Sequence, residues 1–188
     1  FEFALVQDYS SALDDVTRAI RMDGTLFFAY FCRANWRYKL LEYKRAMGET
    51  TNKADFELMM RDYDYVMNHL PDFSFAYYNK ANMLCIQQDF KAAITYYTQA
   101  IATDSDFAEA YFNRANLMAI SGKLPEAYDD YTKAIELEPN LGEAYYNRGL
   151  VQIFMKDTRK GCMDLSKAGE LGILGAYDVL KEFNIAIH

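Results

Sequence analysis

A seven-residue block recurs four times in this sequence, and its last three copies are spaced 34 residues apart. The copies occupy residues 29–35, 76–82, 110–116 and 144–150, and each begins with Ala, Tyr and a second aromatic residue. Self-similarity at a period of a few tens of residues is typical of repeat architectures, in which each repeat is one structural unit. The period therefore constrains the fold more strongly than any local pattern.

A second block follows the first, at residues 93–101 and 127–135, with a looser copy at 161–168. Its small and large apolar residues are three or four positions apart, which places them on one face of a helix. Short polar segments at residues 87–89, 121–123 and 156–158 separate the two blocks of each repeat. Each repeat is therefore predicted to be a hairpin of two antiparallel helices, and stacked hairpins bury the apolar face that each leaves open.

These blocks resemble the tetratricopeptide repeat family. In that family the first helix carries an aromatic and a small residue, and the second carries Ala, an aromatic residue and Ala, followed by Pro. The copy that fits best comprises Tyr111, Ala115, Ala127, Tyr131, Ala134 and Pro139. The resemblance covers nearly the whole chain and implies an all-α fold, a right-handed α-solenoid of antiparallel helix hairpins.

We expect one array over residues 1–188. Residues 1–26 form a truncated repeat, mainly its second helix, with Phe1 to Val6 as the end of a first helix. The repeat at 27–73 is thirteen residues too long, with an insertion near 44–55 that either lengthens the first helix or projects as a flap. Residues 74–107 and 108–141 are regular repeats, 142–172 a divergent one, and 173–188 a C-terminal capping helix. An uncovered N-terminal edge predicts further N-terminal repeats in the parent protein.

Composition excludes several classes of function. The net charge of −7 disfavours a nucleic-acid partner, and the sequence has no apolar stretch long enough for direct membrane insertion. Three cysteines, Cys32, Cys85 and Cys162, lack a CxxC pair, so we expect neither a disulfide framework nor a metal site. No glycine-rich phosphate loop and no Ser, His and Asp set is found. We therefore expect no enzyme activity and no cofactor, and the compartment stays open.

Charged residues recur at one position in the first helices and at one in the second. Because the opposite charges fall in the same hairpins, we predict structural ion pairs between helices rather than ligand contacts. The predicted pairs are Arg33 with Asp62, Arg114 with Asp130, and Arg148 with Asp164.

Asparagines also recur on the first helices, although Asn is a mediocre helix former. The family resemblance places the first helices on the concave surface, where a carboxamide both donates to and accepts from a peptide main chain. This is similar to the asparagine ladder in the repeat superhelix of O-linked N-acetylglucosamine transferase. The predicted binding residues are Asn35, Tyr78, Asn79, Asn82, Phe112, Asn113, Asn116, Tyr146 and Asn147. The alternative is that the amides only cap and bridge neighbouring helices.

Two functions remain open. The first is a non-catalytic protein–protein interaction module that binds a peptide or a partner helix in the concave groove. Phe75, Glu109 and Glu143 stand where a chaperone-tail carboxylate clamp needs Lys and Arg, which disfavours an acidic C-terminal tail as partner. The second is an assembly or oligomerisation module that docks through its N-terminal edge and the 44–55 insertion.

Overall fold

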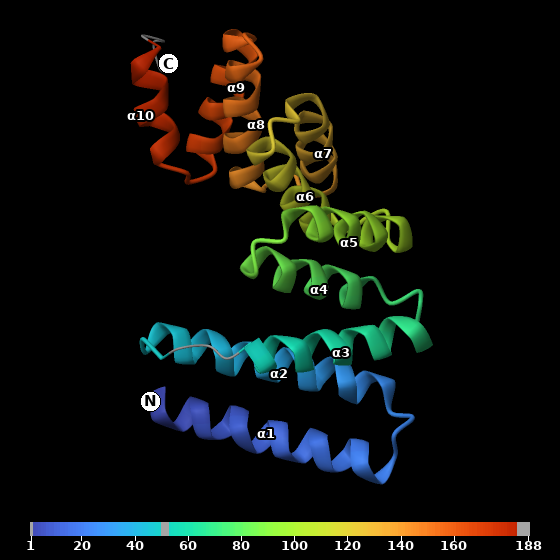
Figure 1. The fold of residues 1–188 in the computed structure, drawn as a ribbon. Coiled ribbons are helices and arrows are strands. Elements are labelled where there is room, and N and C mark those ends of the chain that lie inside the picture. Colours follow the sequence, from blue (N-terminus) through green and yellow to red (C-terminus); the bar gives the residue numbers. More distant parts are fainter. Residues whose placement is uncertain (1, 50–52, 184–188) are drawn as a thin grey trace. The chain divides into compact units, whose positions relative to one another are not determined.

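The computed structural model describes residues 2–49 and 53–183, and all regular structure in those ranges is helical (Figure 1). The prediction of an all-α fold is confirmed. The helices are α1 (Glu2–Met22), α2 (Phe27–Ala46), α3 (Lys53–His69), α4 (Ser74–Ile86), α5 (Phe90–Thr103), α6 (Ala108–Ile120), α7 (Leu124–Leu137), α8 (Gly142–Phe154), α9 (Thr158–Glu170) and α10 (Gly175–Glu182). Where the sequence predicts one array, the chain divides into two compact units, unit 1 (Phe1–Asp89) and unit 2 (Phe90–His188). Repeats contact only their neighbours, so an array has no single central core.

Unit 1 contains α1 to α4, and each helix packs on the next one along the chain. Buried residues of unit 1 lie on α2, α3 and α4. They include Ala34, Leu41, Met59, Tyr63, Val66, Ala81 and Met83. Residues 2–6 belong to the same continuous helix as residues 7–22. The predicted end of a separate first helix at Phe1 to Val6 is therefore wrong over residues 2–6, and Phe1 lies outside the described residues.

The helix α1 is an edge of unit 1. Ala12, Val16 and Ala19 stand at the positions where α3 carries Met59, Tyr63 and Val66, which are buried. On α1 all three are only half-buried, because the main contacts of this helix are with α2. An apolar face thus stays partly open on α1.

The insertion in the second repeat extends its hairpin. The helix α2 has 20 residues against 13 in α4, α6 and α8, and α3 has 17 against 14 in α5. The remaining surplus of three residues lies in the connection, of which residues 50–52 are outside the described part. Of the two predicted alternatives, the structure shows the lengthened first helix, α2. The insertion lengthens α3 as well.

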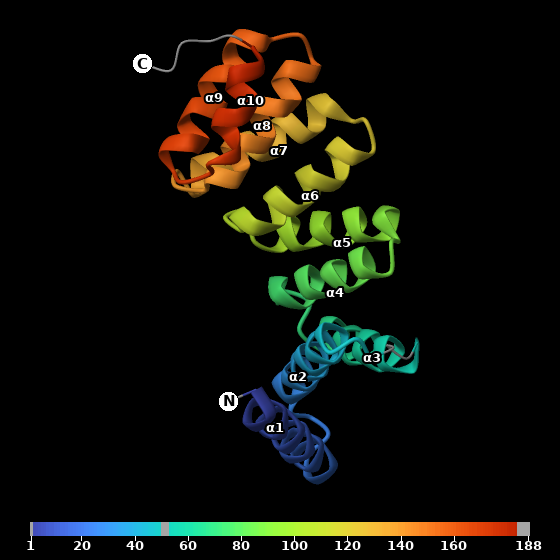
Figure 2. The same ribbon diagram turned by 90° about the vertical axis from the view of Figure 1, so that its left-hand side faces the viewer.

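Unit 2 contains α5 to α10, again packed in chain order. One buried cluster joins α6, α7 and α8 around Ala115, Tyr131 and Val151. A second joins α9 and α10, where Ala176 and Leu180 pack against Leu165. Figure 2 shows α10 lying along α9. The helix α10 therefore covers an apolar face of the last hairpin.

The first helices of the hairpins end in the same hydrogen-bonded turn. At the end of α6, Gly122 N–H donates to Ala119 O (3.0 Å) and Lys123 N–H donates to Met118 O (2.9 Å). This is the Schellman pattern, which needs a left-handed residue that Gly adopts without cost. Gly48 and Gly122 fill this position in two hairpins, whereas Gln88 and Lys156 adopt positive φ in the other two. The lengthened α2 thus ends as the shorter first helices do.

The last hairpin is held by an unusually close approach of two glycines. A Cβ on Gly161 would lie 2.6 Å from the carbonyl oxygen of Gly149, and a Cβ on Gly149 would lie 2.8 Å from that of Gly161. Other first helices carry Ala34, Ala81 and Ala115 at the position of Gly149. The backbones of α8 and α9 are therefore in direct contact, which a side chain would force apart.

We predict that Gly161→Ala destabilises unit 2 by about 1–3 kcal/mol, the usual cost of overpacking, although Ala is the better helix former. The control is Gly175→Ala, because nothing lies within 4 Å of the added Cβ at that position. Thermal and urea unfolding followed by circular dichroism measure the difference. A Gly161→Ala protein as stable as the control would contradict the close packing of α8 and α9.

Candidate functional site

Each of three hairpins is tied by a bidentate ion pair between its first and second helix. Arg114 Nε and Nη2 donate to the two carboxylate oxygens of Asp130, both at 2.7 Å. The same paired geometry joins Arg148 to Asp164 (2.6 and 2.9 Å) and Arg33 to Asp62 (2.8 and 2.6 Å). The three predicted ion pairs are confirmed.

These pairs also link neighbouring hairpins. In unit 2, Arg114 Nη1 donates to Thr98 on α5 (3.0 Å), and Arg148 Nη1 donates to Thr132 on α7 (3.1 Å). In unit 1, Arg37 Nη1 adds a second cation to Asp62 (2.7 Å). The hydrogen bonds to Asp62 raise the pKa of Arg33, whereas burial lowers that of Arg37. The guanidinium groups are therefore occupied within the protein.

The remaining first helix, α4, has a different pair. Lys80 replaces Arg, and its ammonium group contacts the Asp64 carboxylate of α3. Asp64 stands at the position that Thr98 and Thr132 occupy in the later repeats. Tyr96 stands where the other hairpins carry Asp. The cation of α4 thus bonds to the preceding hairpin through a carboxylate.

We predict that Asp130→Ala lowers the free energy of unfolding by about 3 kcal/mol, because it leaves the half-buried Arg114 guanidinium without its anion. The adjacent Asp129 is exposed. We expect the control Asp129→Ala to change stability by less than about 0.5 kcal/mol. Urea unfolding at neutral pH measures both variants. Equal effects would show that the pair carries no structural role.

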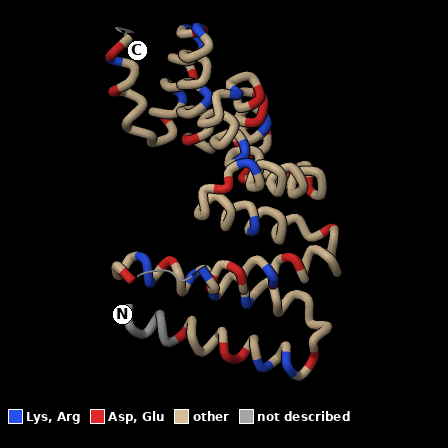
Figure 3. Tube along the Cα trace, viewed as in Figure 1, with Lys and Arg blue, Asp and Glu red and all other residues tan. Residues whose placement is uncertain are grey.

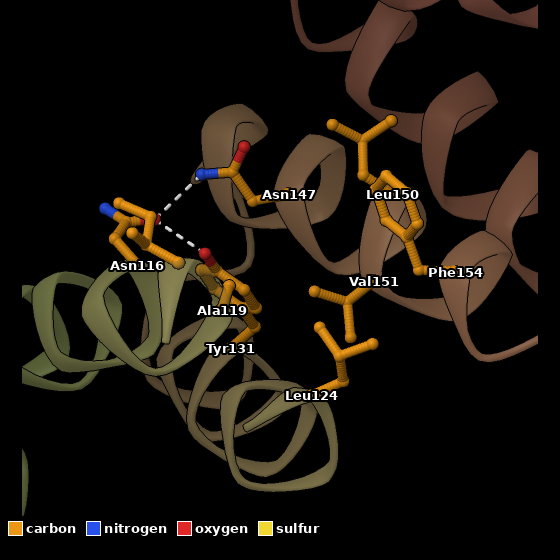
Figure 4. Close-up of a pocket in the computed structure, with 9 residues that line it drawn as sticks. Asn116, Ala119, Leu124, Tyr131, Asn147, Leu150, Val151 and Phe154 are labelled. Carbon is orange, nitrogen blue, oxygen red and sulfur yellow. Dashed lines mark hydrogen bonds between the residues drawn. The ribbon is translucent and has the colours of Figure 1, made fainter. Parts of the chain in front are cut away.

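A second network, from Tyr131 through Asn116 to Asn147, spans two hairpins of unit 2. The Tyr131 hydroxyl on α7 donates to Asn116 Oδ1 on α6 (2.6 Å), and Asn147 Nδ2 on α8 donates to the same oxygen (2.9 Å), as Figure 4 shows. Burial raises the pKa of Tyr131, so its hydroxyl remains a donor at neutral pH. The network orients both amides.

Unit 1 repeats this network with equivalent residues. The Tyr63 hydroxyl donates to Asn35 Oδ1 (2.7 Å), and Asn79 Nδ2 donates to the same oxygen (3.0 Å). Burial raises the pKa of Tyr63 as well. The amide nitrogens of Asn79 and Asn147 thus bridge neighbouring helices, as the alternative prediction has it. The tyrosine donors were missed from sequence, although Tyr63, Tyr97 and Tyr131 recur at 34-residue spacing.

A cleft of about 330 Å³ opens beside Asn147 in unit 2. One wall is polar, with Asn116 and Asn147, and the rest is apolar (Figure 4). The apolar lining residues are Ala119, Ile120, Leu124, Leu150, Val151 and Phe154. Ile120 and Phe154 are 73% and 69% exposed, so their apolar surface is available to a ligand. Their 34-residue spacing is a sequence signal that could have identified them.

The corresponding cleft of unit 1, about 290 Å³, has a more polar lining. It is lined by Asn35, Tyr38, Lys39, Tyr63, Asn79, Asn82 and Met83. Lys39 stands where Ile120 and Phe154 stand in unit 2. It bonds to Glu42 (2.9 Å) and the Tyr38 hydroxyl bonds to the same carboxylate group. Burial and this bond raise the pKa of Tyr38 to about 12.

The structure separates the nine predicted binding residues into two groups. Five of them line the two clefts: Asn35, Asn79 and Asn82 in unit 1, and Asn116 and Asn147 in unit 2. Phe112 instead packs against Tyr131, and Tyr146 packs against the cluster of α9 and α10. Tyr78 and Asn113 are half-buried and line neither of these clefts. Phe112 and Tyr146 thus take part in packing while they stay half-buried, and their role in binding stays a prediction.

The described residues present neither a metal-binding cluster nor a membrane span. Among the described residues, no group of three or more His, Cys, Asp or Glu side chains could hold a metal ion. Nor is any helix in the described ranges long and apolar enough to cross a membrane. Both units carry Lys and Arg as well as Asp and Glu (Figure 3). The helix α2 has five basic residues and one acid, and two of the five, Arg33 and Arg37, are paired with Asp62.

Comparison with known proteins gives a family and a fold. Residues 81–119 and 118–153 match a family model described as TPR repeat. The crystal structure of YrrB, a TPR protein with an unusual peptide-binding site, has a TM-score of 0.71 at 19% identity, covering 95% of this chain and 86% of YrrB. MamA has a TM-score of 0.68 at 19% identity, covering 91% and 92%. No curated protein matches the sequence.

A third solved structure is the first TPR of Spaghetti (RPAP3), bound to the HSP90 peptide SRMEEVD. Its TM-score is 0.57 at 22% identity, covering 59% of this chain and 90% of that domain. The paired helices and the fold of these structures define an all-α helical-repeat solenoid. Residues 81–153 match the tetratricopeptide repeat family, and the solved structures show the same helical-repeat fold for most of the chain.

Proposed function

We propose that this protein is a non-catalytic interaction module that binds an extended peptide or a partner helix along the asparagine-bearing face of its first helices. The observation that carries this proposal is the amide of Asn147. One of its N–H groups is fixed by Asn116. Its carbonyl oxygen points away from Asn116 in Figure 4.

The hydrogen-bonding capacity of Asn147 suits a peptide main chain. A carboxamide has two N–H donors and an acceptor oxygen, and the bond to Asn116 uses only one donor. The remaining N–H and the oxygen match the alternating C=O and N–H groups of an extended backbone. Because Tyr131 and Asn116 hold the side chain in place, less conformational entropy is lost on binding.

The cleft beside Asn147 would receive a side chain of the bound segment. Ile120, Leu124 and Phe154 supply an apolar lining next to the two amides. A site with an apolar lining and a few fixed polar groups is the usual composition of a binding pocket in proteins. Peptide binding by YrrB and by the RPAP3 domain supports the proposal by analogy of fold.

We predict that replacing Asn79, Asn113 and Asn147 together by Ala weakens peptide binding by about ten- to a hundredfold, because each lost hydrogen bond is worth about 1 kcal/mol. Random peptides displayed against the full chain would first yield ligands, whose affinities fluorescence anisotropy then measures. The control is Asn140→Ala, which removes an exposed amide from the loop before α8.

Unfolding curves of the triple variant decide whether any loss arises from binding. Equal affinities of parent and triple variant, with unchanged stability, would overturn peptide binding by these asparagines and assign the amides a structural role. If the parent enriches no peptide at all, groove binding itself is wrong.

A second function, assembly through the N-terminal edge, is favoured by the half-open face of α1. In the family's repeats the equivalent helix is covered by a first helix of its own repeat, so further N-terminal repeats or another subunit would fill this place. The lengthened hairpin also exposes two large apolar residues, Met47 and Leu58.

We predict for this second function a molar mass that rises with protein concentration and returns to that of the monomer in Val16→Glu. Light scattering coupled to size exclusion measures the mass, with Ser10→Glu, at an exposed position of the same helix, as the control. A monomer at every concentration would contradict self-assembly through α1.

A further inference from the structure

The two first helices of unit 2 present opposite chemistry at their two ends. Glu109 and Glu143 lie in the first turns of α6 and α8 and are exposed. Ile120 and Phe154 end the same helices and are also exposed. Spacings of four and eleven residues place the acid, one amide and the apolar residue on one face of each helix. On α6 a second amide, Asn116, follows the acid by seven residues, whereas α8 has Leu150 there.

The charge left over on this face is entirely acidic. Each helix carries one Arg and one Glu. Arg114 and Arg148 are used in their bidentate pairs with Asp130 and Asp164. Glu109 and Glu143 take part in no salt bridge within the described ranges. The favourable interaction of an acid with the helix N-terminus accounts for such a residue in a first turn, but not for its alignment with the amides.

The surrounding charge has the same sign. Residues 90–188 contain 14 Asp and Glu against 10 Lys and Arg, so the whole unit attracts cations. Unit 1 differs at the position of these acids, where it carries the exposed aromatic residues Phe28 and Phe75. The combination of acid and apolar ends is therefore a property of unit 2.

The separation of the two ends sets the length of a matching ligand. Eleven residues of helix between Glu143 and Phe154 correspond to about 16 Å at 1.5 Å per residue. An extended chain covers this distance in about five residues. A Lys or Arg side chain shortens the required span, because its long stem reaches several ångströms from the main chain.

We propose that unit 2 selects a partner segment in which a large apolar residue is followed or preceded, within about five residues, by Lys or Arg. The apolar side chain fills the cleft between Ile120, Leu124 and Phe154, and the cation lies at Glu109 and Glu143. This inference rests on the proposed binding of an extended segment to the amides of the same face. An acidic peptide would instead be repelled by Glu109 and Glu143.

The test uses the peptides that the full chain enriches from a random display library. We expect these peptides to carry an excess of Lys or Arg near a Leu, Ile, Met or Phe. One synthetic enriched peptide is compared with two derivatives, in which Glu replaces the basic residue or Ala replaces the apolar one. We expect each derivative to bind about five- to tenfold more weakly at about 50 mM salt, and the charge effect to fall at about 300 mM salt.

Two variants assign these effects to the residues. Glu109→Gln with Glu143→Gln should bring the parent peptide and its Glu derivative to within about twofold of one another. Phe154→Ala should remove the preference for the apolar residue. The control Glu126→Gln alters an exposed acid in the first turn of α7, off the first helices, and should change neither.

The outcomes separate this inference from the proposed function. Enriched peptides without basic residues, or a preference that survives both Gln substitutions, would overturn the charge selection while leaving amide binding intact. Enrichment of acidic peptides would overturn it as well. If the selection enriches no peptide, or if the asparagine variants bind the enriched peptides as tightly as the parent does, the proposed function fails. This inference then fails with it.

Discussion

The bidentate bond between an arginine of the first helix and an aspartate of the second fixes how each hairpin closes. Arg33, Arg114 and Arg148 each place two N–H donors on one carboxylate. Apolar packing supplies most of the stabilisation, yet it tolerates sliding along a smooth face, whereas a two-point bond defines one register. Because the asparagines lie on the same first helices, this register also sets the relative positions of the amides.

The repeat at residues 74–107 lacks this bond, and the chain divides within that repeat. It carries Lys80 and Tyr96, and a bidentate guanidinium–carboxylate pair cannot form between those residue types. Lys80 contacts Asp64 on α3 instead. The boundary between the two compact units falls between Asp89 and Phe90, in the sequence between α4 and α5. The position of the boundary is thus correlated with a substitution that can be read from the sequence.

Sequence reasoning predicted the hairpins and the ion pairs because both recur at a fixed period. It missed the hydroxyl donors of Tyr63 and Tyr131, because a tyrosine at an apolar position is first interpreted as a packing ring. It did not predict the packing of Phe112 on Tyr131 or of Tyr146 on the last hairpin, because the contacts of an aromatic ring depend on helices distant in sequence. Exposure of Ile120 and Phe154 depends on what the adjacent helices leave open, which periodicity does not reveal.

The lengthened hairpin shows how such a fold changes size without losing its geometry. Seven added residues make almost two full turns of helix, so the end of α2 is rotated by only about 20° from where a shorter helix would leave it. The left-handed turn at Gly48 then directs the chain back on nearly the same side as the turn at Gly122. The first helix of a hairpin can therefore grow by a heptad and carry the turn farther from the neighbouring repeats, while the helix contacts near its base stay in phase.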